Sequence, residues 1–209
     1  MIEPHLLLVF LSASILLALA PGPDNLFVLA QSAQNGRNAG YFVTLGLCTG
    51  LVGHTTAVAL GLAAVVRTSA LAFSLLKYSG AAYLLYLAWQ SFRAGSSSTG
   101  EMKVAALSPR SLYSRGIVMN ITNPKVTLFF LAFLPQFADP SRGSLVLQFF
   151  VLGGFFILAT LMVFGIISIV AGSLGEKFRN SSFARKVVNR GAGAVFVALA
   201  LKLAFSTPR

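Results

Sequence analysis

The sequence is poor in charged residues and poorest in acidic ones. Asp, Glu, Lys and Arg together make up 10% of the 209 residues, whereas soluble domains carry about 25%. Five residues are acidic, and 56% of the chain is hydrophobic. So little charge excludes an ordinary soluble domain. It predicts instead a single helical domain whose partner is the lipid bilayer.

Cysteine and histidine are also scarce. One cysteine, Cys48, excludes an internal disulfide, and two histidines, His5 and His54, are too few for a metal site. Membrane-embedded proteases need a pair of carboxylates, or paired histidines near an acid, and the chain has neither constellation. We therefore expect no enzymatic activity, no cofactor and no metal.

Most of the charged residues in the chain are basic. Sixteen Lys and Arg against five Asp and Glu give a net charge of +11. In a soluble protein such a charge indicates nucleic acid. Here the basic residues lie almost entirely between hydrophobic segments, which is typical of a topology signal. We therefore expect no nucleic-acid partner.

Long hydrophobic stretches are abundant, and six of them can cross a bilayer, which takes about 20 mostly apolar residues. A Gly- and Ser-rich linker separates the first three from the last three. The sequence predicts an all-α polytopic membrane domain over residues 1–209, with a first repeat at 1–92, a linker at 93–113 and a second repeat at 114–209. The expected spans are 4–31, 41–66, 71–92, 114–137, 144–172 and 191–205.

The Lys and Arg residues are divided unevenly between the two sides of these spans. Because cytoplasmic loops are enriched in Lys and Arg, the richer side should face the cytoplasm and both termini the outside. Three spans per repeat then insert the second repeat upside down relative to the first. Ten basic residues follow the first, third and fifth spans (Arg37, Arg93, Lys103, Arg110, Arg115, Lys177, Arg179, Arg185, Lys186, Arg190), and three lie on the opposite side (Arg67, Arg142, Arg209).

The first span of each repeat is interrupted near its middle. The first span contains Pro21, Gly22 and Pro23, and the fourth contains Asn123 and Pro124. Proline inside a helix removes a hydrogen bond and clashes with the preceding turn. In lipid, the freed backbone groups must be satisfied by protein, water or ligand. Matching breaks in inverted repeats are the best sequence pointer to the binding site of a transporter.

The chemistry around the two breaks suits a zwitterion. The positive N-terminal end of each half-helix attracts a carboxylate, and side-chain oxygens of Asp24, Asn25, Asn120 and Asn123 can hold an ammonium. An amino acid carries both groups. The sequence therefore predicts a substrate site formed by Pro21, Gly22, Pro23, Asp24, Asn25, Asn120, Asn123, Pro124, Lys125 and Phe129.

Asp24 and Lys125 follow equivalent prolines in the two breaks. An isolated charge at the bilayer centre costs about 2.5–3.5 kcal/mol on insertion scales. We therefore expect the two side chains to pair when no substrate is bound, and the substrate to compete for both. Two alternatives remain open: Asp24 only caps its half-helix, and Lys125 extends its ammonium toward the membrane interface.

His54 is a second titratable group within a span, so Asp24 and His54 are the candidates for proton coupling. A hydrogen-bonded packing role for His54 is an equal alternative. In the same span, the Gly46-x-x-x-Gly50 spacing predicts that helices approach closely. Such glycine-rich faces are compatible with a homodimer.

These motifs together resemble the LysE/RhtB family of bacterial amino-acid exporters. The resemblance rests on Pro-Gly-Pro-Asp-Asn at 21–25, Gly-Ala-Ala-Tyr-Leu-Leu-Tyr-Leu at 80–87 and Asn-Pro-Lys at 123–125, and it extends over nearly the whole chain. The segment 46–54 is most similar to the homoserine/threonine branch. The resemblance implies export of amino acids across the bacterial inner membrane, driven by the proton gradient.

The chain departs from the family pattern at two positions. Members that handle arginine or lysine carry acidic residues on the second and fourth spans, where this chain has Leu51 and Phe129. The resemblance therefore implies a neutral substrate, such as threonine, homoserine or a branched-chain amino acid. A channel, which also uses broken helices, or a carrier of another small solute is the alternative.

Overall fold

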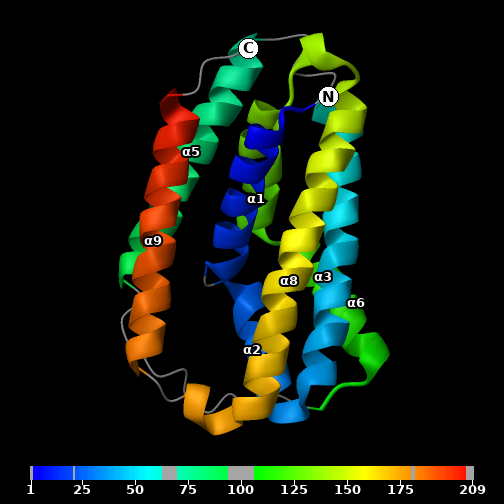
Figure 1. Cartoon of the computed structure of the whole chain (residues 1–209), viewed down its shortest axis with the longest axis vertical. Helices are drawn as coiled ribbons and strands as arrows, with labels where there is room; N and C mark the ends of the chain where they lie inside the picture. The colour runs from blue at the N-terminus through cyan, green and yellow to red at the C-terminus, as the bar shows by residue number, and fades with distance from the viewer. Residues whose placement is uncertain (1, 21, 63–69, 94–105, 180–181, 206–209) are drawn as a thin grey trace.

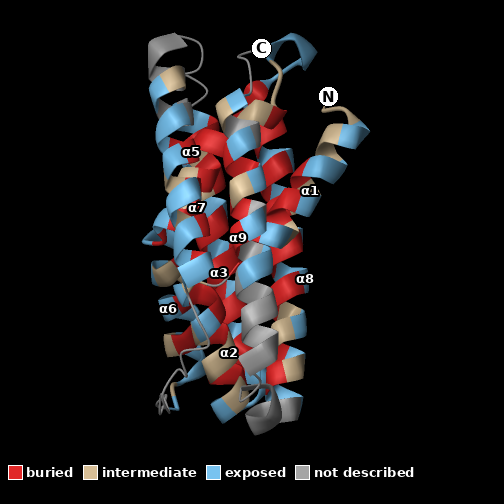
Figure 2. Cartoon of the chain, turned by 90° about the vertical axis from the view of Figure 1, so that its left-hand side faces the viewer, coloured by how far each residue is buried: buried red, intermediate tan, exposed pale blue. Residues whose placement is uncertain are grey.

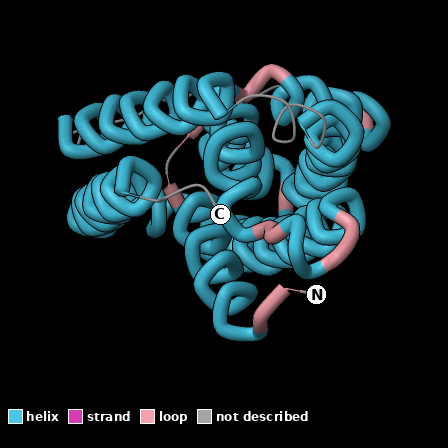
Figure 3. The backbone as a smooth tube through the Cα atoms, turned by 90° about the horizontal axis from the view of Figure 1, so that it is seen from above, coloured by secondary structure: helices cyan, strands magenta, loops and turns pink. Residues whose placement is uncertain are grey.

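The computed structural model describes residues 2–20, 22–62, 70–93, 106–179 and 182–205, and within these ranges every regular element is helical. The helices form an elongated bundle (Figures 1 and 3). The long elements are α1 (Pro4–Leu19), α2 (Pro23–Asn35), α3 (Arg37–Ala57), α5 (Ala70–Arg93), α6 (Pro109–Ile121), α8 (Leu145–Arg179) and α9 (Ser182–Phe205). The short ones are α7 (Pro124–Leu128), the π-helical turns η1 (Val58–Leu62) and η2 (Phe129–Phe133), and the 3₁₀ turns η3 (Leu134–Phe137) and η4 (Pro140–Arg142).

Two single helices and two bent pairs of helices are long and apolar enough to cross a membrane. The single helices lie at Arg37–Gly61 and Leu145–Ser173. The axes of α1 and α2 differ by 62°, and those of α6 and the segment Pro124–Phe137 differ by 48°. The chain is thus an all-helical membrane protein, and the two predicted breaks are confirmed.

Proline chemistry explains both breaks. Prolines 21 and 23 cannot donate backbone N–H groups, so α1 ends at Leu19. Pro23 and Pro124 begin α2 and α7, at the helix position where the missing N–H costs nothing. At the second break, the backbone N–H of Lys125 donates to Asn123 Oδ1 at 3.0 Å, so Asn123 caps α7.

Several helices extend beyond the expected spans, although the candidate span Leu145–Ser173 agrees with the expected one at 144–172 to within one residue. Helix α6 begins at Pro109, before the expected span at 114–137, and the Ser108 hydroxyl accepts from the backbone N–H of Ser111 at its start. Helix α8 continues past 172 to Arg179, and α9 begins well before 191, at Ser182. Hydropathy detects the part of a helix that lies in lipid, whereas the helix itself continues into the polar zone. The expected end of the second span at 66 lies outside the described residues.

The buried apolar side chains form two clusters. Figure 2 shows that the buried positions, in red, lie mainly on the inward faces of the helices. One cluster includes Phe10, Phe129 and Phe133, and the other includes Val43 and Phe164. Along α8 the first cluster ends and the second begins on either side of a buried threonine at 160. Buried polar residues thus occupy the level where the clusters meet, which is the level of the breaks.

Helices α3 and α6 pack backbone against backbone. A Cβ atom on Gly46 would lie 3.0 Å from the Cα of Gly116 and would also meet the carbonyl of Tyr113. A Cβ on Gly50 would lie 2.7 Å from the Asn120 side chain. Only glycine allows such an approach. The predicted close packing at Gly46 and Gly50 is confirmed, and it serves a contact within the chain.

The remaining long helices, α5 and α9, lie side by side at one edge of the bundle (Figures 1 and 3). Gly193 makes room between them, since a Cβ there would lie 2.7 Å from the ring of Phe92. The beginning of α1 and the end of α9 lie at the same end of the molecule (Figure 1).

Candidate functional site

An ion pair joins the two breaks. The ammonium Nζ of Lys125 lies 3.3 Å from Oδ1 of Asp24, and both side chains are 5% exposed. Each residue follows the proline that begins a half-helix, so the first turn of α2 faces the first turn of α7. The predicted pairing is confirmed, and the alternative in which Lys125 extends to the interface is wrong. Their role in transport stays a prediction.

Lys125 also binds the C-terminal end of α1. Its ammonium donates to the carbonyl oxygens of Ala20 at 3.1 Å and Leu17 at 3.4 Å. In an unbroken helix Leu17 would accept from residue 21, but a proline there has no N–H. The ammonium therefore meets unsatisfied carbonyls at the negative end of the α1 dipole. With Asp24, these contacts use all three ammonium donors.

Asn25 completes the cap of α1. Its Nδ2 donates to the carbonyl oxygen of Ala18 at 2.6 Å. The backbone N–H that would bond to Ala18 in a continuous helix belongs to Gly22, which lies beyond the break. The N-cap of α2 is Gly22, and among the described residues no side-chain hydrogen bond caps this helix, so the alternative in which Asp24 is merely a helix cap is also wrong.

Gly22 allows the two half-helices to meet. A Cβ at this position would lie 2.7 Å from Asp24 Oδ1 and 3.0 Å from Lys125 Nζ. The φ angle of −162° is extended backbone that any residue adopts. Glycine therefore serves here to leave space for the ion pair, which a larger residue would displace, and not for its backbone freedom.

Three asparagines around the ion pair retain unused hydrogen-bonding capacity. Among the described side chains, Asn25 Oδ1, Asn120 Oδ1 and Asn123 Nδ2 are buried polar atoms without a hydrogen-bond partner. A buried polar group left unpaired costs about 1–3 kcal/mol. The site thus presents two acceptors and one donor that a bound molecule would satisfy.

A cavity of about 10 Å³ lies beside the ion pair. This volume suffices for roughly one water molecule and is far too small for an amino acid. The conformation is therefore a closed one, and substrate entry requires the surrounding helices to move. Its polar lining comes from Asp24, Asn120, Lys125 and Thr160, and its apolar lining from Leu17, Ala18, Val126, Phe156 and Phe164.

Comparison with known proteins shows the family of this chain. Residues 15–207 match the model of the LysE type translocator family. The chain belongs to that family. It is therefore a membrane transporter and not an enzyme. Uncharacterized membrane proteins of Vibrio cholerae and Bacillus subtilis (YrhP) are 32% and 31% identical, over 96% and 97% of this chain and 97% and 100% of theirs. No solved structure matches.

Thr160 of the translocator was missed by sequence reasoning. It lies on α8, is buried, and lines the cavity with the ion pair. A single threonine in an apolar helix carries no signal that separates it from ordinary packing. Only the spacing to Phe156 and Phe164, one turn away on either side, places it on the buried face.

Other predicted site residues lie at the margin of the site. Pro23 and Pro124 are exposed, so they set the helix starts and do not line the cavity. Phe129 lies among aromatic rings, with centroids 4.8 Å from Phe133 and 5.2 Å from Phe156. Only Phe156 of these three lines the cavity. Pro21 lies outside the described residues.

His54 reaches the site through Asn120. Its Nε2 lies 3.2 Å from the backbone oxygen of Asn120, and its ring lies 5.6 Å from that of Phe130. A carbonyl oxygen only accepts, so Nε2 carries the proton in this contact. The translocator thus has one titratable ring fixed to the end of α6, immediately before the second break.

Proposed function

We propose that this translocator exports neutral amino acids from the cytoplasm of a bacterium through its inner membrane. One observation carries the proposal: a buried ion pair, Asp24–Lys125, lies between the first turns of two half-helices. An amino acid supplies an ammonium for Asp24 and a carboxylate for Lys125. The N-terminal ends of α2 and α7 add positive potential for the carboxylate.

When the substrate binds, its ammonium pairs with Asp24 and its carboxylate pairs with Lys125. Two ion pairs then replace one, and the net charge of the site stays zero. A zwitterion adds no net charge, whereas a cationic side chain would add a charge that a buried site has to compensate. At the positions where lysine and arginine exporters carry acids, this chain has Leu51 and Phe129, which are 0% and 1% exposed. The missing counter-charge favours a neutral substrate. The unpartnered atoms of Asn25 and Asn120 would accept from its ammonium.

We further propose six spans in two inverted repeats, with α5 and α9 as the third span of each. The beginning of α1 and the end of α9 share one end of the bundle (Figure 1), as an even number of spans requires. Arg93 lies 4.7 Å from the ring centre of Trp89, an arrangement typical of a membrane interface. The Arg93 end is proposed as cytoplasmic, and both termini as external.

Coupling to protons is proposed to use Asp24 and His54. Protonation of Asp24 would neutralise its carboxylate and weaken its contact with a substrate ammonium, so a proton and the substrate would compete for binding at one group. A homodimer is proposed as the assembly. Gly46 and Gly50 of α3 pack against α6 within the chain, so a dimer would not use the face that they form.

Counterflow in proteoliposomes tests the function. Vesicles containing the purified translocator are loaded with unlabelled threonine, homoserine, leucine or lysine, and entry of labelled threonine or leucine is followed. We expect acceleration by the neutral amino acids, its loss in Asp24→Asn, and its retention in Asp139→Asn, the same chemical change outside the site. Acceleration by lysine alone would contradict the neutral substrate. Unsaturable flux without counterflow would favour the channel alternative.

A further inference from the structure

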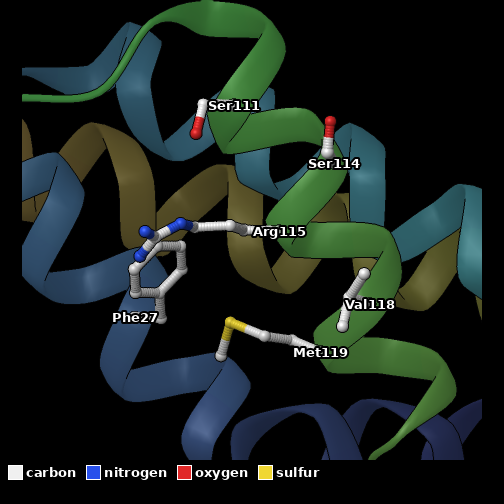
Figure 4. A pocket seen from close by; sticks show the side chains of 6 residues that line it. All are labelled: Phe27, Ser111, Ser114, Arg115, Val118 and Met119. Carbon is white, nitrogen blue, oxygen red and sulfur yellow. The ribbon is translucent and has the colours of Figure 1, made fainter.

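A groove open to the surroundings lies between α2 and α6 (Figure 4). It is separate from the ion-pair cavity and shares none of that cavity's lining residues. Its volume is about 520 Å³. The lining side chains are Phe27 of α2 and Ser111, Ser114, Arg115, Val118 and Met119 of α6.

The α6 residues of this groove change from polar to apolar along the helix. Their spacing of three, four, seven and eight residues places them on one face of α6. Ser111, Ser114 and Arg115 lie nearer the beginning of the helix, and Val118 and Met119 lie deeper. Val118 lines the groove and is 59% exposed. A cation followed by an apolar channel is the complement of a lipid headgroup followed by an acyl chain.

Arg115 is positioned to bind an anion. Its side chain is exposed, and none of the ion pairs between described residues involves it. Figure 4 shows the guanidinium of Arg115 extending from α6 toward Phe27 of α2. Ser111, also on α6, lies on the same side of the groove as the guanidinium. A guanidinium binds phosphate through paired N–H donors. The Ser114 hydroxyl already donates to the carbonyl of Arg110 at 2.7 Å, so Arg115 and Ser111 are the available donors.

The depth of these residues fits a phospholipid. At 1.5 Å per residue along the axis of α6, Arg115 lies about 12 Å from the break at Asn123, and Val118 lies about 8 Å from it. Half of the hydrocarbon core is about 15 Å thick. With the break near the bilayer centre, as in the membrane placement proposed above, the Arg115 guanidinium reaches the headgroups. Val118 and Met119 then lie at the level of the acyl chains.

We propose that the groove is a binding site for an anionic phospholipid. The phosphate binds Arg115 and the Ser111 hydroxyl, and one acyl chain lies against Phe27, Val118 and Met119. Basic pockets between membrane helices on the cytoplasmic side are suited to such headgroups. Because α2 begins at the first break and α6 ends at the second, a lipid seated between them holds two elements of the transport site together.

Native mass spectrometry of the purified translocator tests this site. Delipidated protein is titrated with dioleoyl phosphatidylglycerol and, separately, with dioleoyl phosphatidylcholine. We expect phosphatidylglycerol to bind at lower concentration, and Arg115→Gln to weaken its binding roughly tenfold, as loss of a charge-assisted contact implies. Arg110→Gln, which removes the same charge from the same helix outside the groove, should leave the preference intact. Equal binding of the two lipids to the wild type would overturn the proposal, as would unchanged binding to Arg115→Gln.

A second measurement locates the lipid. Val118→Trp in a Trp89→Phe background places the one tryptophan in the groove, and brominated lipids quench tryptophan fluorescence on contact. We expect brominated phosphatidylglycerol to quench more strongly than brominated phosphatidylcholine, and Arg115→Gln to abolish the difference. Equal quenching by both lipids would mean a non-selective lipid contact. If the protein is a dimer and neither lipid quenches the tryptophan, a second copy occupies the groove. Equal quenching and absent quenching would each overturn the proposal.

Discussion

The ammonium of Lys125 lies 3.1 Å from the carbonyl oxygen of Ala20, slightly closer than the 3.3 Å to the carboxylate of Asp24. A residue from the second half of the chain therefore closes the end of a helix in the first half. In the proposed transport cycle the carboxylate of Asp24 turns to a substrate ammonium, and Lys125 then still has two carbonyl acceptors in α1. The ion pair can open without leaving the lysine charge unsolvated.

This relationship predicts an asymmetry between the two partners. Lys125→Met leaves Asp24 as a buried unpaired charge and leaves the α1 carbonyls unmet, so we expect a loss of about 3–5 kcal/mol of stability. Asp24→Asn leaves Lys125 with the carbonyls of Ala20 and Leu17, so we expect a clearly smaller loss. The stability of both variants is measured by thermal unfolding in detergent, in which size-exclusion chromatography reports the fraction of protein that remains folded at each temperature. Equal losses would mean that the contacts with α1 contribute nothing.

Crowding at Gly22 should disturb the site without changing any charge. In Gly22→Ala the new methyl group would lie 2.7 Å from Asp24 Oδ1, so the ion pair or the bend has to shift. We expect counterflow to fall several-fold while the protein remains folded. Gly53→Ala is the matched control, because nothing lies within 4 Å of a Cβ there. Equal transport by the two variants would contradict the tight fit.

The contact between α3 and α6 should be intolerant of any added carbon. In Gly46→Ala the methyl group meets the backbone of α6, which cannot rotate away as a side chain would. Overpacking of this kind costs about 1–3 kcal/mol, and we expect a lower unfolding temperature. Gly154→Ala on α8, where a Cβ meets nothing within 4 Å, should leave the unfolding temperature unchanged. A similar drop in both variants would point to a general effect of alanine.

A substitution of His54 should separate transport from its proposed coupling to protons. His54→Gln keeps a side-chain N–H that can donate to Asn120 but removes the titratable ring. We expect counterflow to persist, because exchange requires no net proton movement, and uptake driven by an imposed pH gradient to be lost. Retention of both activities would identify His54 as a packing residue. Loss of both would mean that the ring itself is needed for the fold or the substrate.

Asp139, outside the proposed spans, should make stability depend on pH. The hydroxyl of Ser141, then its backbone N–H, and then Arg142 donate to the carboxylate and hold the pKa of Asp139 below its ordinary value. Since the folded pKa is the lower one, this contribution is complete above the ordinary carboxyl pKa and is lost as the pH falls through the folded value. We expect Asp139→Asn to be less stable than wild type at neutral pH, with the difference vanishing in acid. Unfolding temperatures measured from pH 7 to pH 3 check this. A constant difference would show that the charge of Asp139 plays no part.

The breaks were predictable because proline acts locally. Removal of a backbone N–H and the clash with the preceding turn depend on neighbours within one turn, so Pro23 and Pro124 mark the helix starts without knowledge of the fold. The pairing of Asp24 with Lys125 was predictable for a different reason. Two opposite charges near the bilayer centre have few other ways to be satisfied. The ends of the helices were less predictable, because helices continue past the apolar stretch that hydropathy detects.

Composition, proline chemistry and the cost of burying charge are enough to predict a helical membrane protein with two breaks, one candidate ion pair and a glycine face, because these properties depend on neighbouring residues or on the chain as a whole. The folded structure adds that Lys125 caps α1, that Thr160 lines the cavity, and that Arg115 lies at the mouth of a groove. These facts depend on the bend angles and on which helix faces meet. Residues far apart in the chain set both, and no pattern along the chain records them.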